Sequence, residues 1–250
     1  MMRTLFIADL HLSDNAPDLT DLFVQFLREQ APQSAALYIL GDLFDAWTGD
    51  DDDSHTAQQV AQSIQKFSQF APVYFVAGNR DFLLGKNYAL RANMTLLPEN
   101  HMITLHGKHI LLTHGDEMCT DDVSYLRYRK IIRNPLLCQI LLCLPFRKRK
   151  AIAEQIRAKS RAKKQHNYAI SDVTEQGVQA ACQKNRAVDI IIHGHTHRPN
   201  THIHQYLGKN ITRHVLPDWF ENQGGYLAAD ETGFAFFRLP ETTAQTNLNS

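Results

Sequence analysis

Residues 189–197, DIIIHGHTH, join a short apolar run to a glycine flanked by histidines. The run predicts a buried strand over Asp189–Ile192, so the histidines that follow stand at the carboxyl end of that strand. The same arrangement occurs four more times. The apolar runs Thr4–Ala8, Ala36–Leu40, Val73–Ala77 and His109–Thr113 end at Asp9, Gly41-Asp42, Gly78-Asn79 and His114-Gly115. Because ligands of open α/β sheets collect at the carboxyl ends of strands, the pattern predicts that these polar residues share one crevice.

The segments between these strands carry helical periodicity. Apolar residues fall at positions 19, 22, 23, 26 and 27, which is the spacing of an amphipathic helix, and a second helical pattern covers Ser54–Phe70. Alternating strands and helices predict an α/β sandwich with largely parallel strands at its centre. Beyond Thr201 the helical pattern stops, and turn signals at Gly208 and Gly224-Gly225 indicate a terminal antiparallel meander.

Composition limits the class of protein. A chain of 250 residues, 44% apolar and 21% charged, can bury the core of one large domain or two small ones. Equal numbers of basic and acidic residues, 26 of each, exclude a globally basic nucleic-acid coat protein. The four cysteines form no C-x-x-C pair, which excludes a zinc ribbon and favours a reducing compartment. No apolar stretch reaches the roughly 20 residues of a membrane helix, and the N-terminus reads as a strand rather than a signal peptide.

Each strand-end motif is weak evidence when taken alone, because Gly-Asp also caps helices and Gly-Asn also forms left-handed turns. Together the strand ends supply seven oxygen or nitrogen donors. They are Asp9, His11, Asp42, Asn79, His114, His195 and His197. Seven donors are too many for one tetrahedral zinc and suit two divalent ions about 3.5–4 Å apart that share one carboxylate. The lack of a thiolate favours Mn²⁺, Fe²⁺ or Zn²⁺, and such a centre indicates hydrolysis of a phosphoester or phosphoanhydride.

One segment departs from the alternation of strands and helices. Arg127–Lys164 carries 13 lysines and arginines and one acid, Glu154, so its net charge of +12 is balanced by the rest of the chain. The same segment is rich in leucine and isoleucine, which predicts a helical insertion that is both apolar and basic. Two interpretations remain open. The insertion is either a helical hairpin that packs on the core with a solvated basic face, or a lid for an amphiphilic anion that lies against an anionic membrane surface.

The ordered motifs Asp-x-His, Gly-Asp, Gly-Asn, His-Gly and Gly-His-x-His resemble those of the calcineurin-like metallophosphoesterase superfamily. Five longer stretches are similar to the UDP-2,3-diacylglucosamine pyrophosphatase family of lipid A biosynthesis. They are FIADLHL (6–12), YILGDLFDAWTGDDD (38–52), GNRDFLLG (78–85), THGDEMCTDD (113–122) and IIHGHTHRP (191–199). The resemblance implies an α/β fold in which a β-sandwich is flanked by helices in four αββα layers. It further implies a core of residues 1–120 and 171–240, a helical cap for acyl chains at 121–170, and a flexible tail at 241–250.

The same resemblance assigns residues to the site. One metal would be held by Asp9, His11, Asp42 and His197, and the other by Asp42, Asn79, His114 and His195, with Asp42 bridging. The family implies two Mn²⁺ ions per chain. Asn79, Arg80 and His195 are expected to act in catalysis. Substrate contacts map onto Asn79, Arg80, Asp122, Ser160, Lys164, Asn167 and His195, although the family often has Asn and Lys where this chain has Lys164 and Asn167.

Arg80 follows the Gly-Asn motif, where many superfamily members have a histidine that can protonate a leaving alkoxide. An arginine stays charged at working pH and is a poor general acid, but it can bind phosphate oxygens in the transition state. It therefore fits a pyrophosphatase, whose leaving sugar 1-phosphate has a second pKa of about 6 and needs little protonation. We expect water activated by two metals to attack the α-phosphorus of UDP-2,3-diacylglucosamine, which gives UMP and 2,3-diacylglucosamine 1-phosphate (lipid X).

Three other functions are consistent with parts of the sequence. A broad-specificity metal-dependent nucleotide pyrophosphatase or phosphodiesterase would use the same site but gives no reason for the apolar insertion. A scaffold with a decayed metal site is disfavoured because all seven ligand positions are filled. A nuclease is disfavoured by the aliphatic character of the insertion, so nucleic acid is not expected as a partner. No protein partner is implied, and the expected location is the cytoplasm, with peripheral binding to the cytoplasmic face of the inner membrane.

Overall fold

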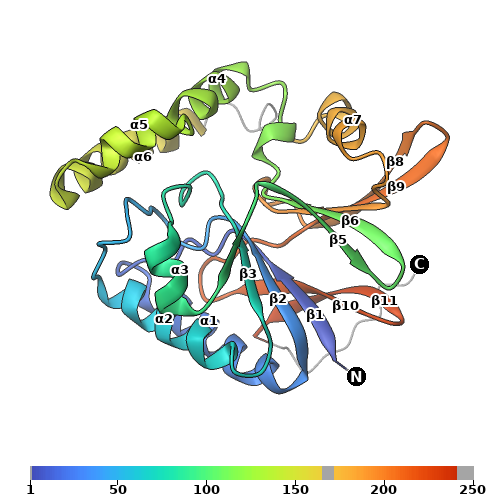
Figure 1. The fold of residues 1–250 in the computed structure, drawn as a ribbon, viewed down its shortest axis with the longest axis horizontal. Helices are drawn as coiled ribbons and strands as arrows, with labels where there is room; N and C mark the ends of the chain where they lie inside the picture. Colours follow the sequence, from blue (N-terminus) through green and yellow to red (C-terminus); the bar gives the residue numbers. More distant parts are fainter. Residues whose placement is uncertain (1, 165–171, 241–250) are drawn as a thin grey trace.

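The computed structural model describes residues 2–164 and 172–240, whose strands form two stacked mixed sheets (Figure 1). The first sheet has the strand order β11-β10-β1-β2-β3-β4. Its strands are β1 (Arg3–Ile7), β2 (Ser34–Leu40), β3 (Val73–Val76), β4 (Thr95–Leu97), β10 (Gly224–Asp230) and β11 (Gly233–Leu239). Strands β1 to β4 are parallel, and β10 pairs antiparallel with β1. Parallel pairing points the carboxyl ends of β1, β2 and β3 to the same edge.

The second sheet has the order β5-β6-β7-β9-β8. Its strands are β5 (Asn100–Leu105), β6 (Lys108–Thr113), β7 (Ile190–His193), β8 (Asn200–Tyr206) and β9 (Lys209–Val215). The three central strands β6, β7 and β9 are parallel, and the two edge strands are antiparallel to their neighbours. The prediction of largely parallel strands at the centre is therefore confirmed for both sheets.

Helices cover the outer face of each sheet. The first sheet is covered by α1 (Pro17–Gln30), α2 (His55–Phe67) and α3 (Lys86–Ala92), and a 3-10 turn η1 (Ala31–Gln33) leads from α1 into β2. The second sheet is covered by α7 (Glu175–Lys184) and the 3-10 turn η2 (Asp116–Met118). The helix α2 begins where the Ser54 hydroxyl accepts a hydrogen bond from Ala57 N at 3.3 Å, as expected of an N-cap serine.

Three apolar clusters lie between these layers. Successive residues of a strand point to opposite faces, so Leu5 packs under the helices of the first sheet while Phe6 packs between the two sheets. In the same way Ile190 and Ile192 lie between the sheets, whereas Ile191 packs against α7. Both faces of the central strands are therefore covered, which explains their continuous apolar runs. The predicted four-layer αββα sandwich is confirmed.

The terminal strands differ from the predicted meander. They form two hairpins, β8–β9 and β10–β11, which join different sheets. The turn signals at Gly208 and Gly225 were compatible with hairpins but carry no information on which sheet each hairpin enters. Pairing of β9 with β7, and of β10 with β1, is decided by long-range packing.

Three further helices form an arm that lies across the top of the molecule in Figure 1, and we call this arm the cap. It consists of α4 (Val123–Ile132), α5 (Pro135–Leu142) and α6 (Phe146–Lys164) and lies in the crossover between β6 and β7. These helices fall within the predicted insertion at 121–170, of which residues 165–170 lie outside the described residues, as does the predicted tail at 241–250. In the part of the chain that the structure describes, no helix is both long and apolar enough to span a membrane.

Candidate metal centre

The strand ends named by the sequence converge at the carboxyl edge of both sheets. Asp9, Asp42 and Asn79 follow β1, β2 and β3, so the first sheet supplies the carboxylates and the amide. His114 follows β6, and His195 and His197 follow β7, so the second sheet supplies most of the imidazoles. The centre therefore spans the junction of the two sheets.

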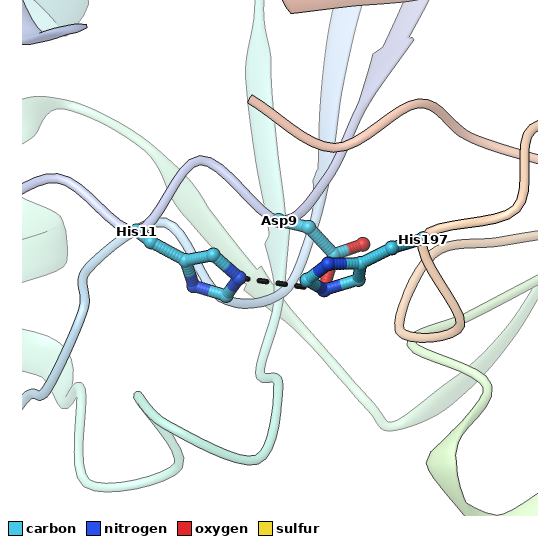
Figure 2. A group of neighbouring side chains, drawn as sticks. All are labelled: Asp9, His11 and His197. Carbon is cyan, nitrogen blue, oxygen red and sulfur yellow. Dashed lines mark hydrogen bonds and ion pairs between the residues drawn. The ribbon is translucent and has the colours of Figure 1, made fainter. Parts of the chain in front are cut away.

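Asp9, His11 and His197 form the first group of donors (Figure 2). The Nε2 atoms of His11 and His197 are 3.5 Å apart, and His197 Nε2 lies 3.4 Å from Asp9 Oδ1. Asp9 Oδ1 and His11 Nδ1 are buried and have no hydrogen-bond partner among the described residues. Buried polar atoms are normally hydrogen-bonded, so these two atoms fit the role of ligands to a cation.

Asn79, His114 and His195 form the second group. Asn79 Oδ1 lies 2.9 Å from both His114 Nε2 and His195 Nδ1. The other ring nitrogen of His114, Nδ1, is 2.9 Å from Leu40 O, and in the neutral tautomer that donates this hydrogen bond Nε2 is available to a metal. Oxygen and nitrogen donors at these distances fit a divalent ion of the Mn²⁺, Fe²⁺ or Zn²⁺ type.

Asp42 lies between the two groups. Its Oδ1 is 3.7 Å from His114 Nε2, and its Oδ2 is 3.9 Å from His11 Nδ1. One oxygen thus faces each group, which is the arrangement expected of a bridging carboxylate. Asp42 is almost fully buried, and this burial raises its pKa in the absence of a cation.

The loops that carry the ligands hold an unusual backbone conformation. Five of the candidate ligand residues have a positive φ, between 54° and 69°. They are Asp9, His11, Asp42, His195 and His197. Such angles are uncommon outside glycine and persist only where the surroundings impose them. Here direct hydrogen bonds do so, because Asp9 N donates to Gly41 O at 3.0 Å, His11 N to Asp42 O at 2.9 Å and His195 N to Asp9 Oδ2 at 2.7 Å.

The glycines of the motifs allow these loops to approach each other. A Cβ on Gly78 would lie 2.2 Å from Asp42 Oδ1, and one on Gly194 would lie 2.2 Å from Asp9 Oδ2. Each glycine therefore stands where a side chain would displace a ligand carboxylate. Close packing of the strand ends, rather than turn geometry, is the reason for glycine at these two positions.

The imidazoles have different proton affinities. Burial lowers the pKa of His195 to about 3, with the charge of His114 acting in the same direction. Burial also acts to lower the pKa of His197, but the neighbouring carboxylates of Asp218 and Asp9 raise it to about 9. Burial opposes ionisation of Asp9, yet His197 and His114 still hold its pKa well below the usual range. The centre therefore contains a carboxylate that stays ionised and an imidazole that stays neutral, both of which suit metal binding.

Arg80 lies beside the candidate ligand Asp42. Its backbone N donates to Asp42 Oδ1 at 2.9 Å, and its Nε is 3.4 Å from Asp42 Oδ2. Its Nη1 donates to Asp45 Oδ1 at 2.8 Å. The guanidinium thus stands beside the expected bridging ligand, where it can reach the oxygens of a phosphate bound at the metals.

The structure describes only some of the residues that were predicted to contact the substrate. Asp122 caps α4 by accepting hydrogen bonds from Tyr125 N at 2.9 Å and Ser124 Oγ at 2.7 Å. The Tyr125 ring stacks on His195 with a centroid distance of 5.9 Å, so the start of α4 reaches the metal centre. The side chains of Ser160 and Lys164 and the whole of Asn167 lie outside the described residues, so their substrate contacts stay predictions.

Three residues near the centre were missed by the sequence reasoning. Asp218 Oδ2 is 3.0 Å from His197 Nδ1 and orients that imidazole. The buried Asp81 accepts from Gly78 N and Leu43 N, both at 2.7 Å, and so joins the loops after β2 and β3. Asp116 accepts a hydrogen bond of 2.5 Å from the Tyr125 hydroxyl. Asp81 and Asp116 lie in the stretches GNRDFLLG and THGDEMCTDD, so their position in these motifs could have indicated a role. Asp218 lies in no such motif.

The basic residues of the cap do not all face solvent. Four of its arginines bind acids of the core. Arg129 binds Asp116 and Glu99, Arg133 binds Glu99, Arg149 binds Asp51 and Arg157 binds Asp45. Arg133 also donates to Gly78 O at 2.7 Å, directly before a ligand residue. Part of the +12 charge therefore attaches the cap to the core through ion pairs. Neither the solvated hairpin nor the membrane-bound lid predicted from the sequence included these ion pairs.

The family model for calcineurin-like phosphoesterases matches residues 2–199, which carry all seven candidate ligands. The chain belongs to this family. It is also 47% identical to the UDP-2,3-diacylglucosamine hydrolase of Stenotrophomonas maltophilia (strain K279a), a match that covers 95% of this chain and 99% of that protein. The enzyme of the same name from Edwardsiella ictaluri is 46% identical, with 99% of this chain and 96% of that protein covered. The chain is thus also a member of the family of these hydrolases.

A solved phosphoesterase structure from E. coli covers 99% of this phosphoesterase, with 16% identity and a TM-score of 0.47. That likeness is too low to carry a functional argument.

Proposed function

We propose that this phosphoesterase hydrolyses the diphosphate bond of UDP-2,3-diacylglucosamine to UMP and 2,3-diacylglucosamine 1-phosphate. The observation that carries the proposal is a cluster of metal donors that contacts an aliphatic cap through Tyr125 and Arg133. Within this cluster, Asp9, His11 and His197 could hold one ion, and Asp9, Asp42 and His114 could hold another. The centre suits the diphosphate, and the cap suits the acyl chains. Full-length relatives that carry the name of this activity support the same substrate.

The cap supplies the apolar surface that an acylated substrate requires. Measured against the described part of the chain, α5 buries none of its eight residues, although most of them are aliphatic. Leu136 is 65% exposed and Ile140 is 55% exposed. Soluble proteins seldom leave contiguous aliphatic surface uncovered unless it binds something. Two acyl chains of the substrate are the occupants that the metal centre makes relevant.

Two divalent cations at the centre, which we propose to be Mn²⁺, would activate a water molecule and offset the charge of the diphosphate. The protein's own groups have separate tasks. Arg80 donates hydrogen bonds to phosphate oxygens. The leaving sugar 1-phosphate requires little protonation, so the lack of a histidine after Asn79 does not impede this reaction.

A broad nucleotide pyrophosphatase or phosphodiesterase is the second candidate function. It would use the same centre, and the exposed aliphatic face of α5 is the observation against it. Equal rates on UDP-glucose and on the diacylated nucleotide would favour this second function.

The cap also supports a proposal for location. Arg127, Lys130, Arg147, Lys148 and Lys150 are exposed on the same arm as the aliphatic residues of α5. We propose that this surface attaches the protein to the cytoplasmic face of the inner membrane. High salt releases the protein if basic contacts dominate, and retention in the membrane pellet at high salt would assign the attachment to the aliphatic residues.

The reaction is tested by ³¹P NMR of the Mn²⁺-loaded protein with UDP-2,3-diacylglucosamine in ¹⁸O-water, with Asp42→Asn as the inactive control. UMP that carries ¹⁸O beside unlabelled 2,3-diacylglucosamine 1-phosphate is the expected result. Label in the lipid product would keep the substrate but move the attack to the other phosphorus. Cleavage of simple phosphodiesters without cleavage of the acylated nucleotide would replace this function by the second candidate.

A further inference from the structure

Asp45 lies between the metal centre and the cap. It stands three residues after Asp42 on the loop that follows β2. Its Oδ1 accepts a hydrogen bond of 2.8 Å from Arg80 Nη1, and both of its oxygens accept from the guanidinium of Arg157 on α6. One carboxylate therefore joins the arginine of the metal centre to an arginine of the cap.

The main chain of Arg80 is fixed without Asp45. Its N donates to Asp42 Oδ1 at 2.9 Å, and its O accepts from Trp47 N at 2.9 Å. Its guanidinium has two carboxylate neighbours among the described residues, Asp45 and Asp42. Without Asp45, the guanidinium would be left beside Asp42 alone and would turn towards the expected bridging ligand instead of the substrate.

The charges of this group favour an incoming anion. Arg80 and Arg157 share the carboxylate of Asp45, and Arg80 also lies beside Asp42. Cations bound at the centre would offset the charge of Asp42, which leaves Asp45 and the two arginines with one net positive charge. All three side chains are at most 28% exposed, which limits screening by solvent. A phosphate oxygen can therefore bind Arg80 while Asp45 keeps Arg157 as a partner.

We propose that Asp45 is a positioning residue that orients Arg80 for phosphate binding and makes this orientation depend on the seating of the cap through Arg157. A second ion pair between the cap and the core lies in this region but does not involve Arg80. Arg149 on α6 binds Asp51 and the carbonyl oxygen of Thr48, but the structure gives Asp51 no contact with Arg80 among the described residues. Asp51→Asn is thus a matched control for Asp45→Asn.

The link between Asp45 and Arg80 is tested by calorimetric titration of the Mn²⁺-loaded full-length protein with inorganic phosphate. Asp45→Asn is expected to weaken phosphate binding about tenfold, which is the lower end of the effect seen when the groups that orient metal ligands are changed. In an Arg80→Gln background the same change should cause no further loss, and Asp45→Glu should retain most of the affinity. Additive losses, or wild-type affinity in Asp45→Asn, would overturn the proposal.

The link to the cap is tested with Arg157→Gln. Asp45 would then neutralise Arg80 alone, so phosphate affinity should fall severalfold, and this fall should vanish in the Asp45→Asn background. Asp51→Asn should raise KM for the acylated nucleotide by loosening the cap but leave phosphate affinity within twofold. Unchanged phosphate affinity in Arg157→Gln would refute the dependence on the cap.

The inference rests on the proposed function. The experiments nevertheless distinguish a failure of the inference from a failure of the proposed function. Calorimetry with inorganic phosphate needs only the metal centre. A wild-type protein that does not cleave UDP-2,3-diacylglucosamine would refute the proposed substrate and leave the coupling of Asp45 to Arg80 measurable. An active enzyme without that coupling would refute only the inference.

Discussion

Replacing Gly78 by alanine should disable the metal centre while the rest of the fold survives. The added Cβ would lie 2.2 Å from Asp42 Oδ1 and 2.4 Å from Asp42 N. A carboxylate could rotate away, but the backbone nitrogen cannot. The two loops must therefore move apart by about 1 Å, and a displacement of that size can reduce the rate of an enzyme about 100-fold.

The effect of Gly78→Ala on the stability of the fold can be measured separately from its effect on metal binding. Overpacking of this kind costs about 1–3 kcal/mol of unfolding free energy, which lowers the melting temperature by about 2–4 °C for each kcal/mol. Mn²⁺ affinity should fall about 10–100-fold, because Asn79 moves with Gly78 away from Asp42. Urea unfolding and calorimetry with Mn²⁺ measure the two quantities separately.

Gly208→Ala is the control for this experiment. Gly208 has a φ of +78° and no described atom within 4 Å of an added Cβ. Alanine there suffers only backbone strain, about 1–2 kcal/mol, and should keep the Mn²⁺ affinity of the wild type. If Gly78→Ala also kept that affinity, close packing would not be the reason for glycine in the motif, and the reasoning would be wrong.

Three further predictions concern other parts of the molecule. Asp218→Ala removes the partner of His197 Nδ1 and should weaken Mn²⁺ binding about 10–100-fold, whereas wild-type affinity in electron paramagnetic resonance titrations would remove Asp218 from the site. Burial opposes ionisation of Asp116, but His114 and Arg129 hold its pKa below the ordinary 3.8, so its contribution to stability is present above that pH and lost as pH falls further. Asp116→Asn should therefore reduce the loss of unfolding free energy between pH 7 and acid pH in urea titrations, and an unchanged pH dependence would contradict this. Ile140→Asp on α5 should leave stability within about 0.5 kcal/mol but reduce sedimentation with anionic vesicles, which equal sedimentation would disprove.

The central strands and the convergence of the polar residues at their ends were predictable because both follow from local pattern. A short apolar run such as Ile190–Ile192 predicts a buried strand in an α/β protein. The polar residue that follows the run then lies at the end of this strand. The short edge strand β4 and the antiparallel β5 were not predicted, since Thr95–Leu97 and Asn100–Leu105 lack a clear apolar run.

Long-range contacts set the limit of prediction at the site. The count of charges in the cap was correct, but counting cannot say that Arg149 meets Asp51 or that Arg157 meets Asp45. Asp218 was missed for the same reason, because its role comes from the path of the chain after β9 and not from a local motif.

The position of the cap in the β6–β7 crossover bears on how this family can change. The two strands are parallel neighbours joined directly by backbone hydrogen bonds, so the sheet does not need the cap helices to close. The entropy of closing a connection grows slowly, by about 0.6 kcal/mol for each doubling of its length. A crossover at this place can therefore be lengthened, shortened or replaced during evolution while the hydrolytic residues at both of its ends stay in register. The same core could in this way acquire new substrates by exchange of a single connection.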